Sequence, residues 1–338
     1  MEPIAYSVPA SAEQAVSEFT SSGEGARYVA GGTTLFDLMK LRVERPTRLI
    51  DVTRIGRDAV TTSGDELRIG TNATMSDVAA DPMIARDYPV LAEALLKGAS
   101  QQLRNMATVG ANLLQRTRCS YFRHGAGAIA SAGAVYPCNK LNPGSGCAAI
   151  GGLDRAQAVL GVSDACTAVS PGDWPVALTA LDARINILGP DGQRSLPVST
   201  LYRLPGDTPH FEFELQPGEL IIEIVIPKTS AGRRSTYHKV RDRESYAFAL
   251  ASAAVALQFD GRRVERAHVA LGGVATKPWR AAATENFLIG KAVGREIALE
   301  AARLAFADAQ PGLHNGFKIE LGIRTLADAV MIASERSA

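Results

Sequence analysis

Two adjacent glycines, Gly31 and Gly32, constrain the fold of this chain more than any other local feature. They follow residues 26–30, whose composition is typical of a strand, and precede residues 33–40, which predict a helix with a threonine as its N-cap. A second strand is predicted at residues 48–52. The chain therefore begins with a small β-α-β unit in which the glycine pair forms the turn from strand to helix.

This turn has the chemistry of a phosphate-binding site. Paired glycines let a phosphate approach the backbone closely, and a helix N-terminus offers free N–H groups and a positive dipole end. A cofactor with a diphosphate fits, although a plain strand-to-helix turn explains the loop equally well when it is taken alone. The usual dinucleotide fingerprint is absent, because Gly23 and Gly25 precede the strand and a third glycine is missing. Asp51 has the position of a ribose-binding acid, but without the glycine fingerprint it is not interpreted as one.

A second glycine-containing stretch lies at residues 107–113 and also suits close backbone contact around Gly110. The side chains of Thr108 and Asn112 can hydrogen-bond a phosphate or a ribityl chain. Taken alone, this stretch is better explained as a turn with an asparagine near a helix start. A cofactor site is favoured over a plain turn only when this stretch is considered together with the first glycine pair.

Hydrophobic periodicity and breaker residues divide the rest of the chain into alternating strands and helices. The remaining predicted strands are residues 66–70, 161–168, 184–188, 220–226, 247–259 and 264–271. The remaining predicted helices are residues 12–19, 74–97 with a new start at Asp81 and Pro82, 175–181, 281–289, 295–308 and 325–335.

A polar, glycine-containing segment at residues 228–234 predicts a domain boundary. The first domain, residues 1–227, is expected to consist of lobes at about 1–57 and 58–227. The second domain is expected at residues 228–338, with strands followed by helices. Separate β-α-β and strand-then-helix patterns in one chain predict an α+β fold.

The cysteines are the most unusual part of the composition, because all four lie in one stretch of the chain. Residues 115–152 of this stretch are rich in Gly, Ala, Ser and Pro and lack periodicity, which predicts a long loop with a function. Four thiolates can hold a [4Fe–4S] cluster, form two disulfides or bind zinc, and without a Cys-x-x-Cys the spacing leaves these three open. Nearby basic side chains would favour thiolates and a negatively charged cluster; they are Arg116, Arg118, Arg123 and Lys140.

Composition excludes several other classes of function. A net charge of +1 provides no broad basic field for nucleic acid or anionic lipid. No apolar stretch reaches the roughly 18 residues of a membrane-spanning helix. The N-terminus lacks a secretory signal, so a cytoplasmic protein is expected unless another chain carries it. The five histidines show no metal-ligand spacing, and no catalytic triad, paired-carboxylate site or molybdenum-cofactor site is evident, so the chain is predicted to hold no substrate site.

The two glycine stretches, in this order, resemble the FAD-binding subunits of the xanthine dehydrogenase and carbon monoxide dehydrogenase family. The resemblance continues downstream and covers nearly the whole chain, at residues 170–173, 176–182, 217–227, 237–239, 245–251 and 277–280. It implies a two-lobed FAD-binding domain of the molybdenum-hydroxylase flavoprotein type, followed by a C-terminal antiparallel sheet with helices.

Within that family the chain is most similar to the flavin subunits of periplasmic aldehyde oxidoreductases, in which an inserted loop holds a [4Fe–4S] cluster. Residues 115–166 match this loop, apart from Leu141, Gln157, Ala158, Gly172 just beyond it and a longer stretch after Arg123. The resemblance implies that the cluster ligands are Cys119, Cys138, Cys147 and Cys166.

The resemblance also implies a set of flavin contacts. The two loops would hold the diphosphate, Leu220 and Ile221 would pack against the flat ring, and Lys239 would offset negative charge on the reduced flavin. Asp173 would accept hydrogen bonds from hydroxyl or N–H groups. The full set is Val29, Ala30, Gly31, Gly32, Thr33, Thr34, Leu35, Gly98, Ala99, Thr108, Gly110, Ala111, Asn112, Asp173, Leu220, Ile221 and Lys239.

The function implied is that of an electron-transfer subunit of a molybdenum hydroxylase. Electrons would arrive from a large subunit with the molybdenum cofactor through a small subunit with [2Fe–2S] clusters, reduce FAD and leave to an external acceptor. Aldehydes are the expected substrates of the complex, and purines or another heteroaromatic are an alternative. Two rival interpretations are a self-sufficient flavin oxidoreductase and a non-enzymatic, zinc-binding scaffold. The family likeness also allows a periplasmic location through co-export with a partner subunit.

Overall fold

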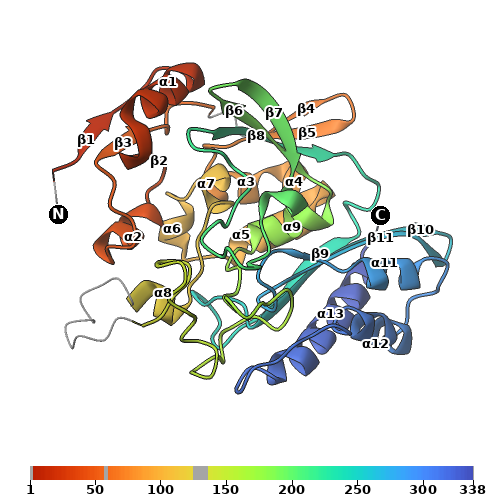
Figure 1. The fold of residues 1–338 in the computed structure, drawn as a ribbon. Helices are drawn as coiled ribbons and strands as arrows, with labels where there is room; N and C mark the ends of the chain where they lie inside the picture. Colours follow the sequence, from red (N-terminus) through yellow and green to blue (C-terminus); the bar gives the residue numbers. More distant parts are fainter. Residues whose placement is uncertain (1–2, 57–59, 125–135, 338) are drawn as a thin grey trace.

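The structure is a computed structural model that describes residues 3–56, 60–124 and 136–337. A small parallel sheet with strand order β1-β3-β2 forms the first lobe (Figure 1). Its helix α1 begins where the Ser11 hydroxyl accepts the N–H of Gln14, and it buries Ala15 and Val16 against the strands. The elements of this lobe are β1 (Ala5–Ser7), α1 (Ala12–Ser22), the 3₁₀ turn η1 (Gly23–Gly25), β2 (Ala26–Val29), α2 (Leu35–Lys40) and β3 (Arg48–Asp51).

A five-stranded antiparallel sheet with the order β4-β5-β8-β6-β7 forms the second lobe. Its central strand β8 is rich in β-branched residues, which suits a strand with neighbours on both sides. The strands are β4 (Val60–Ser63), β5 (Glu66–Gly70), β6 (Arg184–Gly189), β7 (Gly192–Pro197) and β8 (Leu220–Pro227).

Short helices fill the space between this sheet and the rest of the molecule (Figure 1). The predicted helical region at 74–97 is divided into three helices, because a proline begins both the second and the third. The break at Asp81 was predicted, whereas the break before Pro89 was missed. The helices are α3 (Met75–Ala80), α4 (Pro82–Asp87), α5 (Pro89–Leu96), α6 (Gln101–Arg104), α7 (Val109–Asn112), α8 (Ser120–His124), α9 (Trp174–Ala180) and α10 (Val198–Leu201).

The C-terminal part is an antiparallel sheet with the order β12-β11-β10-β9, covered on one side by three helices (Figure 1). Its core is rich in alanine, which lets α13 approach β10 closely. The predicted helix at 325–335 is eight residues too short at its start, since α13 begins at Phe317. The elements are β9 (Ser235–Val240), β10 (Ala251–Asp260), β11 (Arg263–Gly272), β12 (Trp279–Arg280), α11 (Ala282–Leu288), α12 (Arg295–Leu304) and α13 (Phe317–Glu335).

Strand β8 connects the two lobes of the first part because neighbouring side chains on it point in opposite directions. Leu220 is buried in the core of the first lobe, and Ile221 is buried in the core of the second. The Tyr28 hydroxyl also donates to the Gly218 carbonyl at 2.7 Å, which fixes β2 beside the turn before β8. The α+β fold expected from the sequence is confirmed.

The predicted strand at residues 161–168 is wrong. The chain turns there because Gly161 has a φ of 65° and the Ser163 hydroxyl accepts the N–H groups of Ala165 and Cys166, each at 3.2 Å. The sequence patterns also missed β1, β4, β7, β9 and β12, of which β1 and β12 have only three and two residues. Among the residues described, no helix is long and apolar enough to cross a membrane.

Candidate cofactor site

The two glycine stretches, far apart in the sequence, lie against each other in the structure. A Cβ added to Gly31 would lie 1.8 Å from the carbonyl oxygen of Met106 and 3.2 Å from Cα of Ala107. Such a contact between two backbones leaves no room for a side chain. The structure thus joins residues 29–35 and 106–112 into one surface of closely packed backbone.

The first stretch leads directly into α2. Gly32 adopts a φ of 69°, and its carbonyl accepts the N–H of Phe36 at 3.0 Å, so the turn and the first helical residues form one hydrogen-bonded unit. Thr34 is the N-cap, as predicted, but its side chain makes no capping hydrogen bond. The N–H groups at the start of α2 therefore lack a side-chain acceptor from their own cap residue.

The second stretch carries two polar atoms without a partner. The Thr108 hydroxyl and the Asn112 carbonyl oxygen are both buried and make no hydrogen bond among the described residues. Gly110 packs against Thr71, whose Cβ would lie 2.5 Å from an added Cβ, and donates its N–H to the Thr71 carbonyl at 2.9 Å. Since buried polar groups are nearly always satisfied, a water molecule or a polar ligand is expected to complete the hydrogen bonding of these two atoms.

Gly98 and Ala99 join the same region through Met75. The Met75 methyl group lies 3.1 Å from a Cβ built on Gly98, and its sulfur lies 3.3 Å from the Asn112 amide nitrogen. Ala99 has a φ of 50°, a left-handed conformation that is uncommon for a residue with a Cβ. This turn between α5 and α6 is thus fixed beside the second glycine stretch.

Asp173 and Lys239 form a buried ion pair, an arrangement that the sequence analysis did not predict. The Lys239 ammonium donates to Asp173 Oδ2 at 2.7 Å and to the Lys97 carbonyl at 3.0 Å, with only 1 % of its side chain exposed. The Tyr237 hydroxyl donates to Asp173 Oδ1 at 2.5 Å, and burial holds the Tyr237 pKa well above its usual range. The charge that was expected to face a reduced flavin is therefore neutralised within the chain.

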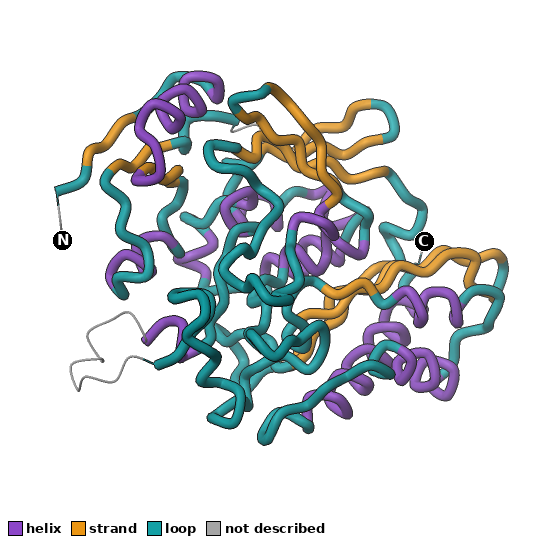
Figure 2. Tube along the Cα trace, viewed as in Figure 1, coloured by secondary structure: helices purple, strands orange, loops and turns teal. Residues whose placement is uncertain are grey.

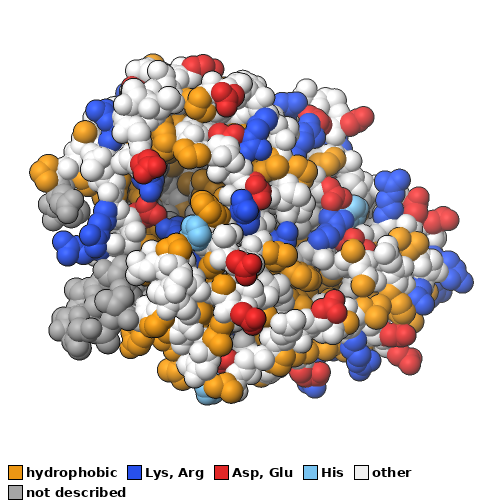
Figure 3. Space-filling model, viewed as in Figure 1, with side chains coloured by type: hydrophobic (Ala, Val, Ile, Leu, Met, Phe, Trp, Pro, Cys, Tyr) orange, Lys and Arg blue, Asp and Glu red, His pale blue; other side chains and the backbone are white. Residues whose placement is uncertain are grey.

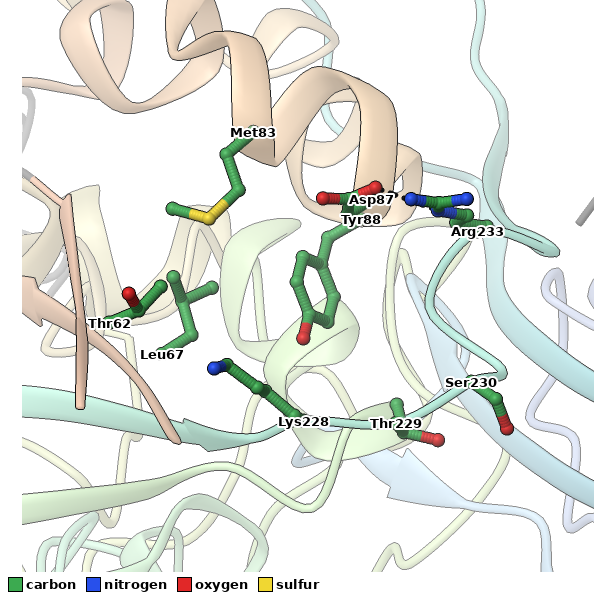
Figure 4. A pocket seen from close by; sticks show the side chains of 9 residues that line it. All are labelled: Thr62, Leu67, Met83, Asp87, Tyr88, Lys228, Thr229, Ser230 and Arg233. Atoms are coloured by element: carbon green, nitrogen blue, oxygen red, sulfur yellow. Dashed lines mark hydrogen bonds and ion pairs between the residues drawn. The ribbon is translucent and has the colours of Figure 1, made fainter. Parts of the chain in front are cut away.

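The face between the first lobe and the rest of the molecule is hollowed, and hydrophobic side chains line the hollow (Figure 3). A different hollow of about 300 Å³ lies between β5, α4 and residues 228–233 (Figure 4). Its one carboxylate, Asp87, is paired with Arg86 and Arg233 at 2.6 and 2.8 Å, which holds the Asp87 pKa at about 2. None of the predicted site residues lines this second hollow.

All four cysteines lie close together in the structure. Figure 2 shows long stretches of irregular chain in the middle of the molecule. Cys119, Cys138 and Cys166 are buried in one cluster. The backbone of Cys147 pairs with that of Cys138 in an isolated antiparallel β-bridge, and the Cys147 side chain is hydrogen-bonded to Cys166. All four are free thiols. The two disulfides considered from the sequence are therefore not formed.

The thiols differ in acidity. The hydrogen bond from Cys166 lowers the Cys147 pKa to about 5, whereas that bond and burial raise the Cys166 pKa. Burial raises the pKa of Cys119 and of Cys138. Over residues 3–56, 60–124 and 136–337, no three Cys, His, Asp or Glu side chains are arranged to hold one metal ion.

Basic residues near the cysteines hold the loop against both lobes. Arg116 forms ion pairs with Glu44 of the first lobe at 2.7 Å and with Glu212 of the second at 2.6 Å. Arg118 and Arg123, on either side of Cys119, both pair with Asp37 of α2. The sequence indicated these basic residues but gave no signal for their acidic partners.

The C-terminal part supports the cysteines indirectly, through residues 156–158. The Gln157 amide donates to Cys119 Sγ at 3.3 Å, and the carbonyls of Gln157 and Ala158 accept hydrogen bonds from the side chain of Asn315. The buried Lys318 ammonium donates to the Ala156 carbonyl at 3.2 Å. The loop before α13 and the start of α13 thus position the segment that touches Cys119.

Comparison with known proteins gives matches over most of the chain. Residues 2–229 match the family model described as the FAD binding domain in molybdopterin dehydrogenase, and residues 235–329 match the CO dehydrogenase flavoprotein C-terminal domain. The chain is 47% identical to the aldehyde oxidoreductase FAD-binding subunit PaoB of Escherichia coli, over 90% of this chain and 91% of that protein. It is 26% identical to the carbon monoxide dehydrogenase medium chain of Hydrogenophaga pseudoflava, over 90% and 87%.

Two solved structures have the same fold. Carbon monoxide dehydrogenase from Hydrogenophaga pseudoflava, in a form lacking the Mo-pyranopterin moiety of its cofactor, superimposes with a TM-score of 0.76 at 26% identity, covering 99% of each chain. A cyanide-inactivated Cu,Mo-CO dehydrogenase gives a TM-score of 0.75 at 25% identity and covers 100% of each chain.

Proposed function

This chain belongs to the FAD-binding subunits of the molybdenum hydroxylases, and from that premise we propose how its residues hold the flavin and a second redox group. As a member of this family it is an oxidoreductase subunit with a role in electron transfer. FAD, when bound, supplies the redox chemistry of such a subunit, while the protein supplies binding, orientation and electrostatics. We place the substrate site on a partner chain that carries the molybdenum cofactor.

The diphosphate of FAD is held where the two glycine stretches meet. The observation that carries this assignment is the pair of buried atoms on Thr108 and Asn112 that have no partner among the described residues, in the stretch whose Met106 and Ala107 contact Gly31. Backbone N–H groups at the start of α2 donate to the phosphates, and the two side chains hydrogen-bond the ribityl or phosphate oxygens. The absence of a Cβ at Gly31 keeps the two backbones close enough to form one surface.

The contacts to the flavin ring come from the junction with the C-terminal sheet. Leu220 and Ile221 place β8 beside the ring, with their side chains directed into opposite cores, and Asp173 with its partner Lys239 supplies a fixed polar group. Because the pair is neutral as a whole, it contributes hydrogen bonds more than net charge. Lys239 therefore orients Asp173, which differs from the direct neutralisation of a reduced flavin expected from the sequence.

The four cysteines hold a [4Fe–4S] cluster, which when bound supplies one-electron chemistry. Two features of the described chain support this assignment: the thiols gather without forming disulfides, and the arginines on either side of Cys119 in the sequence both pair with Asp37. The Arg118 Nε and Arg123 Nη2 atoms are buried donors without a partner among the described residues, which suits a negatively charged group nearby. Cys147, with its lowered pKa, provides a thiolate at neutral pH.

The partners proposed are a large subunit with the molybdenum cofactor, a small subunit with [2Fe–2S] clusters and an external electron acceptor. The complex oxidises aldehydes, a substrate class supported by the 47% identity to an aldehyde oxidoreductase subunit. Assays of the complex with aromatic aldehydes and with xanthine would separate this substrate class from the heteroaromatic alternative. Faster turnover of xanthine than of any aldehyde would contradict the proposal.

The cofactor assignments are tested by measuring flavin, iron, sulfide and zinc per chain in complex purified without oxygen. One FAD, with about four irons and four sulfides on this subunit, is expected. FAD without iron on this subunit would remove the cluster and keep the flavin site. Zinc in place of iron would support the scaffold interpretation of the cysteine loop.

A further inference from the structure

The helix that follows the glycine pair is also the element that the cysteine loop contacts. Helix α2 contributes Leu38 to the buried cluster that contains Cys119, Cys138 and Cys166. The preceding residue, Asp37, lies in the first turn of the helix and points its carboxylate at the same loop. One short helix therefore has the glycine turn at its start and contributes a side chain to the cluster that contains three of the cysteines.

Asp37 is the meeting point of two cations. Its Oδ2 atom accepts from Arg118 Nη1 at 3.0 Å and from Arg123 Nη1. Arg123 is held in place because its Nε donates to the Thr117 carbonyl at 3.1 Å, and only 9 % of its side chain is exposed. The two guanidinium groups thus converge on one carboxylate from both sides of Cys119.

This arrangement depends on the negative charge of Asp37. Removing the carboxylate would leave two neighbouring, largely buried cations without compensation, and a buried charge that loses its partner is strongly destabilising. The segment around Cys119 would then move away from α2 to reach water.

Movement at Asp37 is transmitted to the glycine turn by backbone hydrogen bonds. The Phe36 N–H donates to the Gly32 carbonyl, and the Leu38 N–H donates to the Thr34 carbonyl, each at 3.0 Å. Asp37 lies between these two donors, so its position and that of residues 32–35 are linked within a single helical turn. A displacement of about 1 Å at such a site is enough to disturb a bound ligand.

We propose that Asp37 is a positioning residue that couples the cysteine loop to the FAD-binding turn, so that disturbing Cys119 accelerates the release of FAD. The proposal rests on the FAD and cluster sites assigned above and adds a link between them. Asp37 acts on the flavin through Gly32 and Thr34, and on the cysteine loop through Arg118 and Arg123.

The test measures the rate of FAD release from the purified complex, followed by the rise in flavin fluorescence after dilution. Asp37→Asn keeps the size of the side chain and removes its charge, and at least a tenfold faster release is expected. Asp37→Glu restores the charge and should recover most of the lost retention. Asp328→Asn is the matched control, because Asp328 pairs with Arg295 on the exposed side of the C-terminal helices.

A double-mutant cycle separates coupling from two independent defects. Cys119→Ser alone should accelerate release, and in the double variant with Asp37→Asn the rate should exceed that of the faster single variant by less than twofold. Independent sites would instead multiply their effects. Fold-changes in release rate that multiply in the double variant would overturn the coupling. Release of FAD from Asp37→Asn at the wild-type rate would also overturn it. If Cys119→Ser does not assemble, Arg118→Gln replaces it in the cycle with the same expected outcomes.

The same samples keep this proposal distinct from the cofactor assignments. Iron and FAD content of the wild-type complex test those assignments directly, whereas the coupling is read from ratios of release rates. A wild-type complex with FAD and no iron beyond that of its [2Fe–2S] clusters would remove the [4Fe–4S] cluster, and a non-multiplicative cycle would still support the link from the Cys119 thiol to the flavin. A wild-type complex without FAD would overturn both.

Discussion

The glycine stretches and the cysteine loop hold their parts of the molecule together by different means. At the first, the backbones near Gly31 and Met106 touch directly, and a missing Cβ is what makes the contact possible. At the second, side chains of opposite charge such as Arg116 and Glu44 bridge a loop to its surroundings. The difference teaches that the first region tolerates no added atom, whereas the second tolerates changes of shape better than changes of charge.

The largest effect is expected at the backbone contact. Gly31→Ala would place a Cβ 1.8 Å from the Met106 carbonyl oxygen, so the two stretches must separate. We expect a loss of about 3 kcal/mol or more in the free energy of unfolding, and loss of FAD from the purified protein. Urea unfolding and the flavin absorbance per chain measure both. Gly294→Ala is the control, since nothing lies within 4 Å of its added Cβ, and an equal loss there would refute the steric explanation.

A pH-dependent effect on the free energy of unfolding is expected from Lys318, next to the cysteine loop. Burial, followed by the charge of Arg155, lowers the Lys318 pKa from 10.5 to about 8 in the folded state. Between pH 8 and 10.5 the unfolded chain holds the proton that the folded chain has released, so stability rises with pH across this window. The rise is about 3 kcal/mol at most, and it is lost again as the pH falls from 10.5 to 8.

The comparison of wild type with Lys318→Met isolates this contribution. Unfolding free energies of both proteins at pH 7 and pH 10 should show the wild type gaining more than the variant, because other titrating groups cancel in the difference. The variant also removes hydrogen bonds to the Ala156 and Gly273 carbonyls, which shifts its stability without adding a slope. Parallel pH profiles for the two proteins would show that Lys318 keeps its ordinary pKa.

Two smaller effects of opposite sign are expected at the glycine stretches, one on stability and one on FAD affinity. The Thr108 hydroxyl has no partner within the described chain, so Thr108→Val should leave the flavin-free protein equally stable or slightly more stable. It should weaken FAD binding about tenfold, because a hydrogen bond to the cofactor is lost. Flavin titration and thermal unfolding of the flavin-free protein measure the two effects. Weakened stability with unchanged FAD affinity would place the hydroxyl's partner inside the protein.

The smallest effect is expected at the ion pair between Arg116 and Glu44. Both side chains are mostly buried but remain partly solvated, at 19 % and 15 % exposed. Glu44→Gln should lower stability by about 1 kcal/mol, and the difference from wild type should shrink in high salt. Urea unfolding at low and high ionic strength measures it. A loss of stability that does not depend on salt would indicate that packing, and not charge, holds the cysteine loop. The contrast with the glycine stretches would then be weaker.

The sequence predicted those elements whose cause is local. The strand and helix around Gly31 follow from periodicity and breaker residues, and the long loop follows from the lack of periodicity. The extra break at Pro89 and the turn at Ser163 also have local causes, a proline and a serine. The sequence analysis missed both because the surrounding apolar pattern predicts a continuous helix and a strand. These are errors of local interpretation.

Contacts between distant residues were beyond the sequence. The pairs Asp37 with Arg123 and Asp173 with Lys239 are separated by 86 and 66 positions, and no local pattern joins them. The same holds for the contact of Gly31 with Met106, which explains why a plain turn accounts equally well for the first glycine stretch alone and better for the second. Which charge meets which is decided by the tertiary fold, so the structure was needed to find the partners.

The order of strands in the five-stranded sheet has a consequence for synthesis of the chain. The hairpins β4-β5 and β6-β7 are complete early, but among the described strands it is β8 that joins them at the centre of the sheet. The ribosome must therefore release residues up to Pro227 before this sheet can close. Both glycine stretches and all four cysteines precede β8 in the chain, so they leave the ribosome before the framework that encloses them exists.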